Sequence, residues 1–125
     1  MAQIKTFKDL QVWQKAHELT LLIYTVTRKF PDDERFGLIS QQKRAAVSIA
    51  SNIVEGFRRH TVKDSLNFYN IAASSLEEVK YQLLLSKDLK FINKEDFEIV
   101  NGIAEEVSRL LYRWIESNKA KLTDF

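Results

Sequence analysis

Three similar helix-start signals divide this chain into long segments, and they constrain its fold more than any other feature. In each, a side chain with an oxygen atom stands three positions before an aspartate: Thr6 with Asp9, Thr61 with Asp64, and Asn93 with Asp96. Such an oxygen accepts hydrogen bonds from free N–H groups in the first turn of a helix, and the aspartate complements the helix dipole. The signals predict helices that begin just after residues 6, 61 and 93.

Few residues along the chain can end a helix. There are one proline and three glycines among 125 residues, which favours a few long helices over many short strands. The stop signals are Pro31 after Phe30, the His60-Thr61 pair after Arg59, and a break at 91–93. We therefore expect helices at about residues 7–30, 34–59, 62–90 and 94–118. Gly37 is expected to separate a short turn at 33–36 from the rest of the second helix.

Each expected helix carries apolar residues at the three- and four-residue spacing of a buried helical face. The four stripes are Leu10, Trp13, Ala16, Ile23, Val26 and Phe30; Ile39, Ala46, Ala50, Ile53 and Phe57; Tyr69, Ala72, Leu76, Val79 and Leu83; and Val100, Ile103, Val107, Leu110 and Trp114. Short connections make consecutive long helices antiparallel. The sequence therefore predicts an all-α protein, a single domain over 1–125 folded as an up-down-up-down antiparallel four-helix bundle.

Several kinds of site lack the residues they need. The chain has no cysteine, which excludes a disulfide scaffold, a thiolate zinc site and a cysteine nucleophile. Its two histidines are His17 and His60, and the positions three residues before them hold Gln14 and Phe57. A carboxylate-bridged di-metal centre in a bundle needs glutamates there. We expect no metal and no cofactor.

Carboxylates offer only a weak case for catalysis. Glu77 and Glu78 are adjacent, so they point about 100° apart on a helix and cannot face each other. Glu55 could meet one of them across two helices, as a carboxylate pair with a perturbed pKa, or each could accept hydrogen bonds at a helix contact. With no Ser-His-Asp set in view, we expect the protein not to be an enzyme.

No segment predicts export or a membrane location. The N-terminal stretch MAQIKTFKDLQVW has no apolar signal core, and LTLLIYTV at 19–26 is too short to cross a bilayer. The absence of cysteine fits a reducing compartment. We expect a soluble cytoplasmic protein with no membrane contact.

The positive charge is unevenly distributed. The net charge is only +2, but the segment 41–63 carries five basic residues against the single acid Glu55. These basic residues are Lys43, Arg44, Arg58, Arg59 and Lys63. Such a basic band indicates an anionic partner; the alternative is an ordinary solvated helix face.

The segment VSIASNIVEGFRR at 47–59 combines apolar residues with an unusual polar stripe. Ser48, Asn52 and Glu55 fall on the side opposite Ala46, Ala50 and Ile53 at about 100° per residue. Serine and asparagine are mediocre helix formers, and Gly56 costs about 1 kcal/mol relative to alanine. Short side chains suit close approach by another helix or a ligand, so we interpret Ser48, Asn52, Glu55 and Gly56 as a contact surface.

The third helix carries more apolar surface than one core requires. Phe68, Ile71 and Leu85 lie beside its main stripe. An exposed apolar patch on a small domain marks a contact surface, although a wide stripe at the bundle centre would read the same way. We expect this second face to mediate self-association.

These residues resemble a known family. The similar motifs are FxDLxVWQKA at 7–16, FP at 30–31, GLxxQ at 37–41, RAAVSIASNIVEG at 44–56 and IAASSLEE at 71–78. Together they resemble the 23S rRNA-intervening-sequence proteins, bacterial four-helix bundles, over nearly the whole chain. Ala50 stands where that family often has proline. The resemblance implies a homopentamer, and similarity to accessory proteins of diversity-generating retroelements implies nucleic-acid binding.

Our leading functional hypothesis is therefore a non-catalytic oligomeric bundle that binds RNA or DNA, with structured RNA preferred, through the basic band. The alternative is a protein-interaction scaffold with no nucleic-acid role, in which the polar stripe docks a partner.

Overall fold

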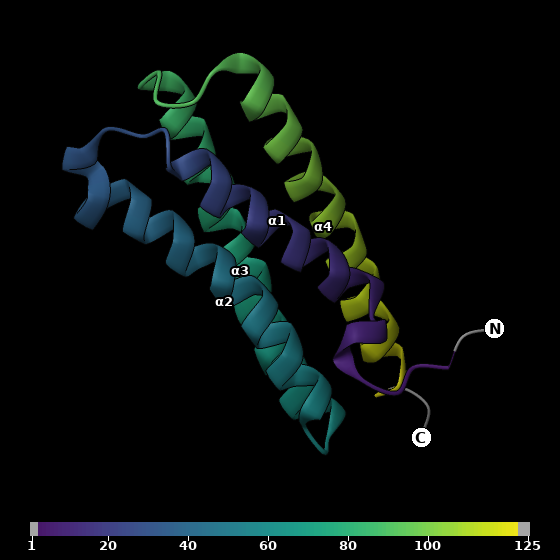
Figure 1. The fold of residues 1–125 in the computed structure, drawn as a ribbon. Helices are drawn as coiled ribbons and strands as arrows, with labels where there is room; N and C mark the ends of the chain where they lie inside the picture. Colours follow the sequence, from purple (N-terminus) through teal and green to yellow (C-terminus); the bar gives the residue numbers. More distant parts are fainter. Residues whose placement is uncertain (1–2, 123–125) are drawn as a thin grey trace.

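The protein is described by a computed structural model that covers residues 3–122. Within this range the chain forms α1 (Gln11–Thr27), α2 (Ser40–Arg58), α3 (Val62–Asp88) and α4 (Lys94–Ala120), and no β-strand. The chain reverses direction at each connection between helices (Figure 1). Helices α1 and α3 each pack against both α2 and α4. The predicted all-α four-helix bundle is confirmed.

Two of the three start signals cap the helices they were expected to cap. The Thr61 hydroxyl oxygen accepts from the Asp64 N–H at 3.1 Å, and the Asn93 side-chain oxygen accepts from the Asp96 N–H at 2.7 Å. Both caps satisfy donors that have no partner inside a helix. Helices α3 and α4 therefore begin at Val62 and Lys94.

The first start signal caps a short turn instead of a long helix. Thr6 and Asp9 form a reciprocal capping box around a 3₁₀ turn at Phe7–Asp9. Leu10 then adopts an extended conformation, with ψ of 122°, and its side chain is buried. The expected continuous helix from residue 7 is wrong because burial of Leu10 breaks it, and α1 starts at Gln11.

The end of α1 and the start of α2 also differ from the predicted bounds. After Thr27, the Lys29 and Phe30 N–H groups bond to carbonyls three residues back, a tighter turn that leads into Pro31. A 3₁₀ turn at Asp32–Glu34 and a π-helical turn at Arg35–Ile39 follow. Gly37 has non-helical φ and ψ of −109° and −111°, so α2 begins at Ser40 and not at 34.

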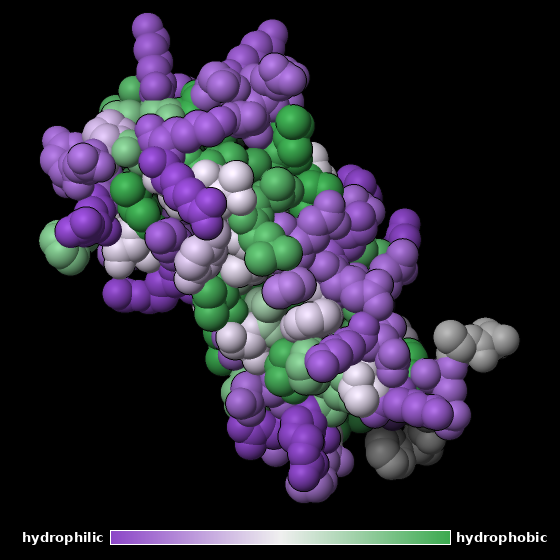
Figure 2. All heavy atoms as spheres, in the orientation of Figure 1, coloured by the Kyte–Doolittle hydropathy of each residue, from purple (hydrophilic) through white to green (hydrophobic). Residues whose placement is uncertain are grey.

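The core lies along the bundle axis. The predicted stripe of α3 is buried along its whole length, whereas on α2 and α4 the buried face is rotated from the predicted one. On α2, Ala45 and Ile49 are buried while Ala50 and Phe57 are half-buried. One face of the molecule shows hydrophobic residues along its middle and hydrophilic ones toward both ends (Figure 2). No helix of residues 3–122 is both long and apolar enough to cross a membrane.

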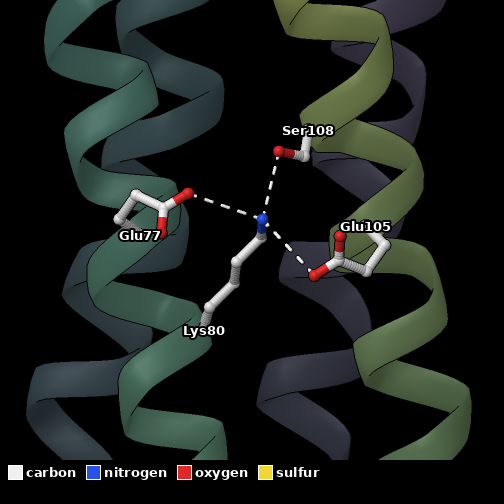
Figure 3. Close-up of polar contacts among 4 residues, drawn as sticks. All are labelled: Glu77, Lys80, Glu105 and Ser108. Atoms are coloured by element: carbon white, nitrogen blue, oxygen red, sulfur yellow. Dashed lines mark hydrogen bonds and ion pairs between the residues drawn. The ribbon is translucent and has the colours of Figure 1, made fainter.

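Lysines on α1 and α3 tie both helices to α4. The Lys80 Nζ lies 3.4 Å from Glu105 and 3.5 Å from Glu77, and it donates to the Ser108 hydroxyl at 3.1 Å (Figure 3). On the other side of α4, the Lys15 Nζ lies 3.6 Å from Glu106. The neighbouring acids Glu105 and Glu106 thus connect α4 to two different helices.

Candidate nucleic-acid interface

The predicted basic band is divided between the two ends of α2. Lys43 and Arg44 lie near the start of α2, while Arg58 and Arg59 lie at its end and Lys63 in the first turn of α3. Lys43 and Arg58 are fifteen residues apart on one helix, which is about 22 Å at 1.5 Å per residue. The five residues of the predicted basic band therefore lie in two separate groups.

At the start of α2, one of the two cations is already engaged. The Lys43 ammonium lies 4.8 Å from the centre of the Tyr24 ring, an attraction between a cation and the ring face. Lys43 is half-buried and Arg44 is exposed. This end of the helix offers little concentrated charge.

The connection between α2 and α3 collects more accessible charge, and we call Arg58, Arg59 and Lys63 the basic turn. Arg58 and Lys63 are exposed, and within residues 3–122 neither has an acidic side chain within ion-pair distance. Arg59 pairs with Glu55 at 3.2 Å and its guanidinium lies 4.3 Å from the Phe68 ring centre. Arg58 and Lys63 are thus the uncommitted cations of the turn.

Two further lysines join the basic turn from distant parts of the sequence. Lys5 and Arg58 line one hollow, and Lys121 lines another together with Arg59 and His60. This follows from the up-down path, which brings the N-terminal turn, the α2–α3 connection and the end of α4 to the same end of the bundle (Figure 1). Sequence reasoning missed both lysines because they lie outside the segment 41–63.

The predicted polar stripe of α2 forms part of its contact with α3. The Ser48 and Ser75 hydroxyl oxygens are 2.8 Å apart. Asn52 donates to the Ser48 carbonyl and hydroxyl oxygens at 2.8 and 3.0 Å. Ser48 and Asn52 are half-buried, so the helix that approaches these short side chains is α3 of the same chain.

Gly56 serves the inside of the bundle. It is buried, and a Cβ atom placed on it would lie 2.4 Å from Cε1 of Tyr69. That is far below van der Waals contact, so the missing side chain makes room for the Tyr69 ring. The close approach expected at Gly56 is made by α3 of the same chain.

The second predicted apolar face lies beside the same stripe. Phe68, Ile71 and Ser75 share one face of α3 by their three- and four-residue spacing. Ser75 touches α2 through Ser48, and Phe68 touches it through Arg59. We call this flank the α2–α3 seam: Ser48, Asn52, Phe68, Ile71 and Ser75. The predicted polar stripe and apolar face therefore meet along the seam, although Gly56 and Leu85 lie outside it.

Exposure differs along this apolar face. Ile71 is 48% exposed, whereas Phe68 is half-buried beneath Arg59. Leu85 is half-buried and packs against the core. Ile71 is therefore the member of the predicted set that remains most available to a partner.

The three glutamates form no facing pair in the structure. Glu55 pairs with Arg59, Glu77 with Lys80, and Glu78 accepts from Gln82 at 3.1 Å. The alternative in which Glu55 meets Glu77 or Glu78 across the helices is therefore wrong. Each carboxylate is matched to a donor three or four residues further along the chain.

The histidines lie apart from each other. His17 is exposed and stacks on Trp13 with ring centres 5.0 Å apart, and His60 is exposed in the α2–α3 connection. Across residues 3–122, no group of three or more His, Asp or Glu side chains is placed to hold a metal ion.

The fold defines a small antiparallel four-helix-bundle protein, and the exposed cations Arg58 and Lys63 lie at one of its ends. The chain belongs to the 23S rRNA-intervening sequence protein family, whose model matches residues 8–113. The family resemblance seen in the sequence is thereby confirmed.

One solved structure shares this fold closely. It is a protein of unknown function from the S23 ribosomal protein family of Bacteroides thetaiotaomicron, with a TM-score of 0.78 and 27% sequence identity. The match covers 84% of this chain and 95% of that one. No curated protein matches the chain significantly.

Proposed function

We propose that this chain is a non-catalytic nucleic-acid-binding protein and that the basic turn binds the phosphate backbone of structured RNA. The observation that carries the proposal is the pair Arg58 and Lys63, exposed and without an acidic partner among residues 3–122. Uncommitted cations release counterions from a phosphate backbone on binding. Lys5 and Lys121 extend the positive surface at the same end.

The proposal includes self-association in the cytoplasm, with five copies as the family resemblance implies. An assembly multiplies a small charged footprint, because backbone affinity grows with the number of phosphates engaged. Ile71, nearly half exposed on the α2–α3 seam, supports a contact between copies. Arg58 and Lys63 are exposed at the end of the bundle and are not part of the seam, so these two cations stay accessible when the seam is covered.

A filter-binding salt series with a hairpin RNA tests the proposal. The double variant R58Q/K63Q should bind more weakly, and each lost phosphate contact should reduce the salt slope by about 1. The matched control K43Q/R44Q removes the same charge from the other end of α2. Equal losses in the two variants, or no binding by the wild type at low salt, would overturn the proposal.

The second candidate function is a protein-interaction scaffold, and the exposure of Ile71 on the seam favours it. In that case a purified partner protein would bind after nuclease treatment, and Ile71→Asp would abolish binding while R58Q/K63Q would not. If R58Q/K63Q instead loses RNA binding and no protein partner remains bound after nuclease treatment, the nucleic-acid role is supported.

A further inference from the structure

A hollow of about 210 Å³ lies where the α2–α3 connection meets the C-terminal end of α4. We call it the terminal hollow. Its wall contains three buried polar side chains, Ser65, Tyr69 and Asn118. Buried polar groups are costly unless they are hydrogen-bonded, so the partners of these groups indicate what the hollow can accept.

Two of the three polar groups are engaged with the backbone. The Ser65 hydroxyl donates to the Gly56 carbonyl at 2.7 Å, and the Asn118 amide donates to the Trp114 carbonyl at 2.8 Å. The Arg59 N–H also bonds to the Gly56 carbonyl, at 3.3 Å. The Gly56 carbonyl oxygen, which would otherwise repel an anion, is therefore already hydrogen-bonded.

One buried donor remains for an anion. The Trp114 Nε1 is buried and has no hydrogen-bond partner of acceptable geometry in the described residues. Burial raises the pKa of the Tyr69 hydroxyl and the Trp114 side chain opposes that rise, because the indole N–H is directed toward the Tyr69 oxygen. The indole N–H thus faces the phenol oxygen, and the phenol O–H is the member of this pair that is left to donate to an anion at the hollow.

The charge around the terminal hollow is positive. Its rim carries Lys121, His60 and Arg59, the last of which is paired with Glu55, and none of the lining residues within 3–122 is acidic. Phe57 lines both this hollow and the neighbouring one that contains Arg58. A phosphate seated here would therefore have further cations beside it for the rest of a strand.

We propose that the terminal hollow binds a terminal phosphate group of a nucleic-acid strand. A phosphate monoester carries about −1.5 to −2 charge at pH 7 and three acceptor oxygens, more than an internal phosphodiester offers. It also enters a hollow from one side, whereas an internal phosphate has chain on both sides. The assignment rests on the proposed nucleic-acid role and specifies which part of the strand is recognised.

The test compares one hairpin RNA with a 5′-phosphate, a 3′-phosphate or hydroxyl groups at both ends. Wild type should bind one phosphorylated form about tenfold more tightly than the hydroxyl form, the scale of one charge-assisted contact. Tyr69→Phe and Trp114→Phe each remove one donor and keep a ring, and both should bring the ratio toward one. R58Q/K63Q should weaken all forms and leave the ratio unchanged.

A second measurement needs no RNA. Inorganic phosphate should shift the NMR signal of the Trp114 indole N–H and leave unchanged that of Trp13, which does not line the terminal hollow and is the internal control. Circular dichroism establishes that both variants fold. Equal affinity of the wild type for phosphorylated and hydroxyl-ended RNA overturns the strand-end assignment but not the role of the basic turn. An unchanged Trp114 signal overturns the phosphate site. A shifted Trp114 signal without RNA binding overturns only the proposed function.

Discussion

Replacing Gly56 with alanine measures how tightly α2 and α3 are packed. The new Cβ would lie 2.4, 2.8 and 3.0 Å from three carbons of the Tyr69 ring, where contact needs about 3.5–4.0 Å. The ring cannot retreat freely, because Tyr69 is 1% exposed and packs edge-on against Trp114 at 6.0 Å. Overpacking of this kind lowers the free energy of unfolding by about 3 kcal/mol, and the better helix propensity of alanine raises it by about 1 kcal/mol. We expect a net loss of about 2 kcal/mol.

The same substitution at Gly102 is the matched control. Gly102 is exposed within α4, and no atom lies within 4 Å of its added Cβ. Gly102→Ala should therefore stabilise the protein by about 0.5–1 kcal/mol. Urea unfolding at one fixed protein concentration reports both values, provided that the m-value stays constant. If Gly56→Ala is as stable as the wild type, the reasoning about Tyr69 fails.

Three further predictions concern single side chains. Lys90 has a left-handed φ of 65°, so Lys90→Gly should raise the free energy of unfolding by about 1 kcal/mol in urea titrations; a loss of stability would contradict this. Lys80→Met should lower the free energy of unfolding by about 1 kcal/mol, and by less in 1 M salt, where the screening length is about 3 Å. Lys94→Met removes a more exposed ion pair and should change the free energy of unfolding little. Burial raises the pKa of Tyr69 above 10.0. The stabilisation that the neutral phenol gives the folded state is therefore fully present below about pH 10 and is lost as the pH rises through the folded-state pKa. Tyr69→Phe should remove this loss of stability at the alkaline end of a stability–pH profile.

Helix existence could be predicted from the sequence because its signals are local. A threonine or asparagine cap and an apolar stripe act within a few residues, and the starts of α3 and α4 follow from Thr61 and Asn93 alone. The break at Leu10 could not be predicted in this way, because it depends on the burial of one side chain in a core built by distant residues.

The site was harder to predict, because the charge or small size of a residue does not show which part of the fold it faces. A count of cations along 41–63 joins two groups that α2 holds about 22 Å apart. Gly56 was correctly singled out as a residue for close approach, yet one helix cannot show which neighbour approaches. That neighbour is Tyr69, thirteen residues further on, and Lys121 reaches the same end from the last helix.

The symmetry of the proposed assembly can be tested with two charged substitutions. A closed ring joins two different patches of each subunit head to tail, whereas a two-fold dimer joins one patch to itself. The α2–α3 seam supplies one patch, centred on Ile71. A second lies on the other flank of α2, where Tyr24 sits beneath Lys43 and where Val47 is 40% exposed.

Ile71→Asp and Val47→Asp should each reduce the native mass to monomers or small oligomers if the subunits form a ring. Ile71 and Val47 are 48% and 40% exposed in a single subunit, so both variants should keep their helical circular dichroism. A carboxylate buried at each contact costs several kcal/mol. An equimolar mixture of the two variants is decisive. In a head-to-tail contact, the intact seam of Val47→Asp can bind the intact second patch of Ile71→Asp, so the mixture should form dimers that neither variant forms alone. If only Ile71→Asp dissociates the assembly, the seam pairs with itself and the ring is wrong.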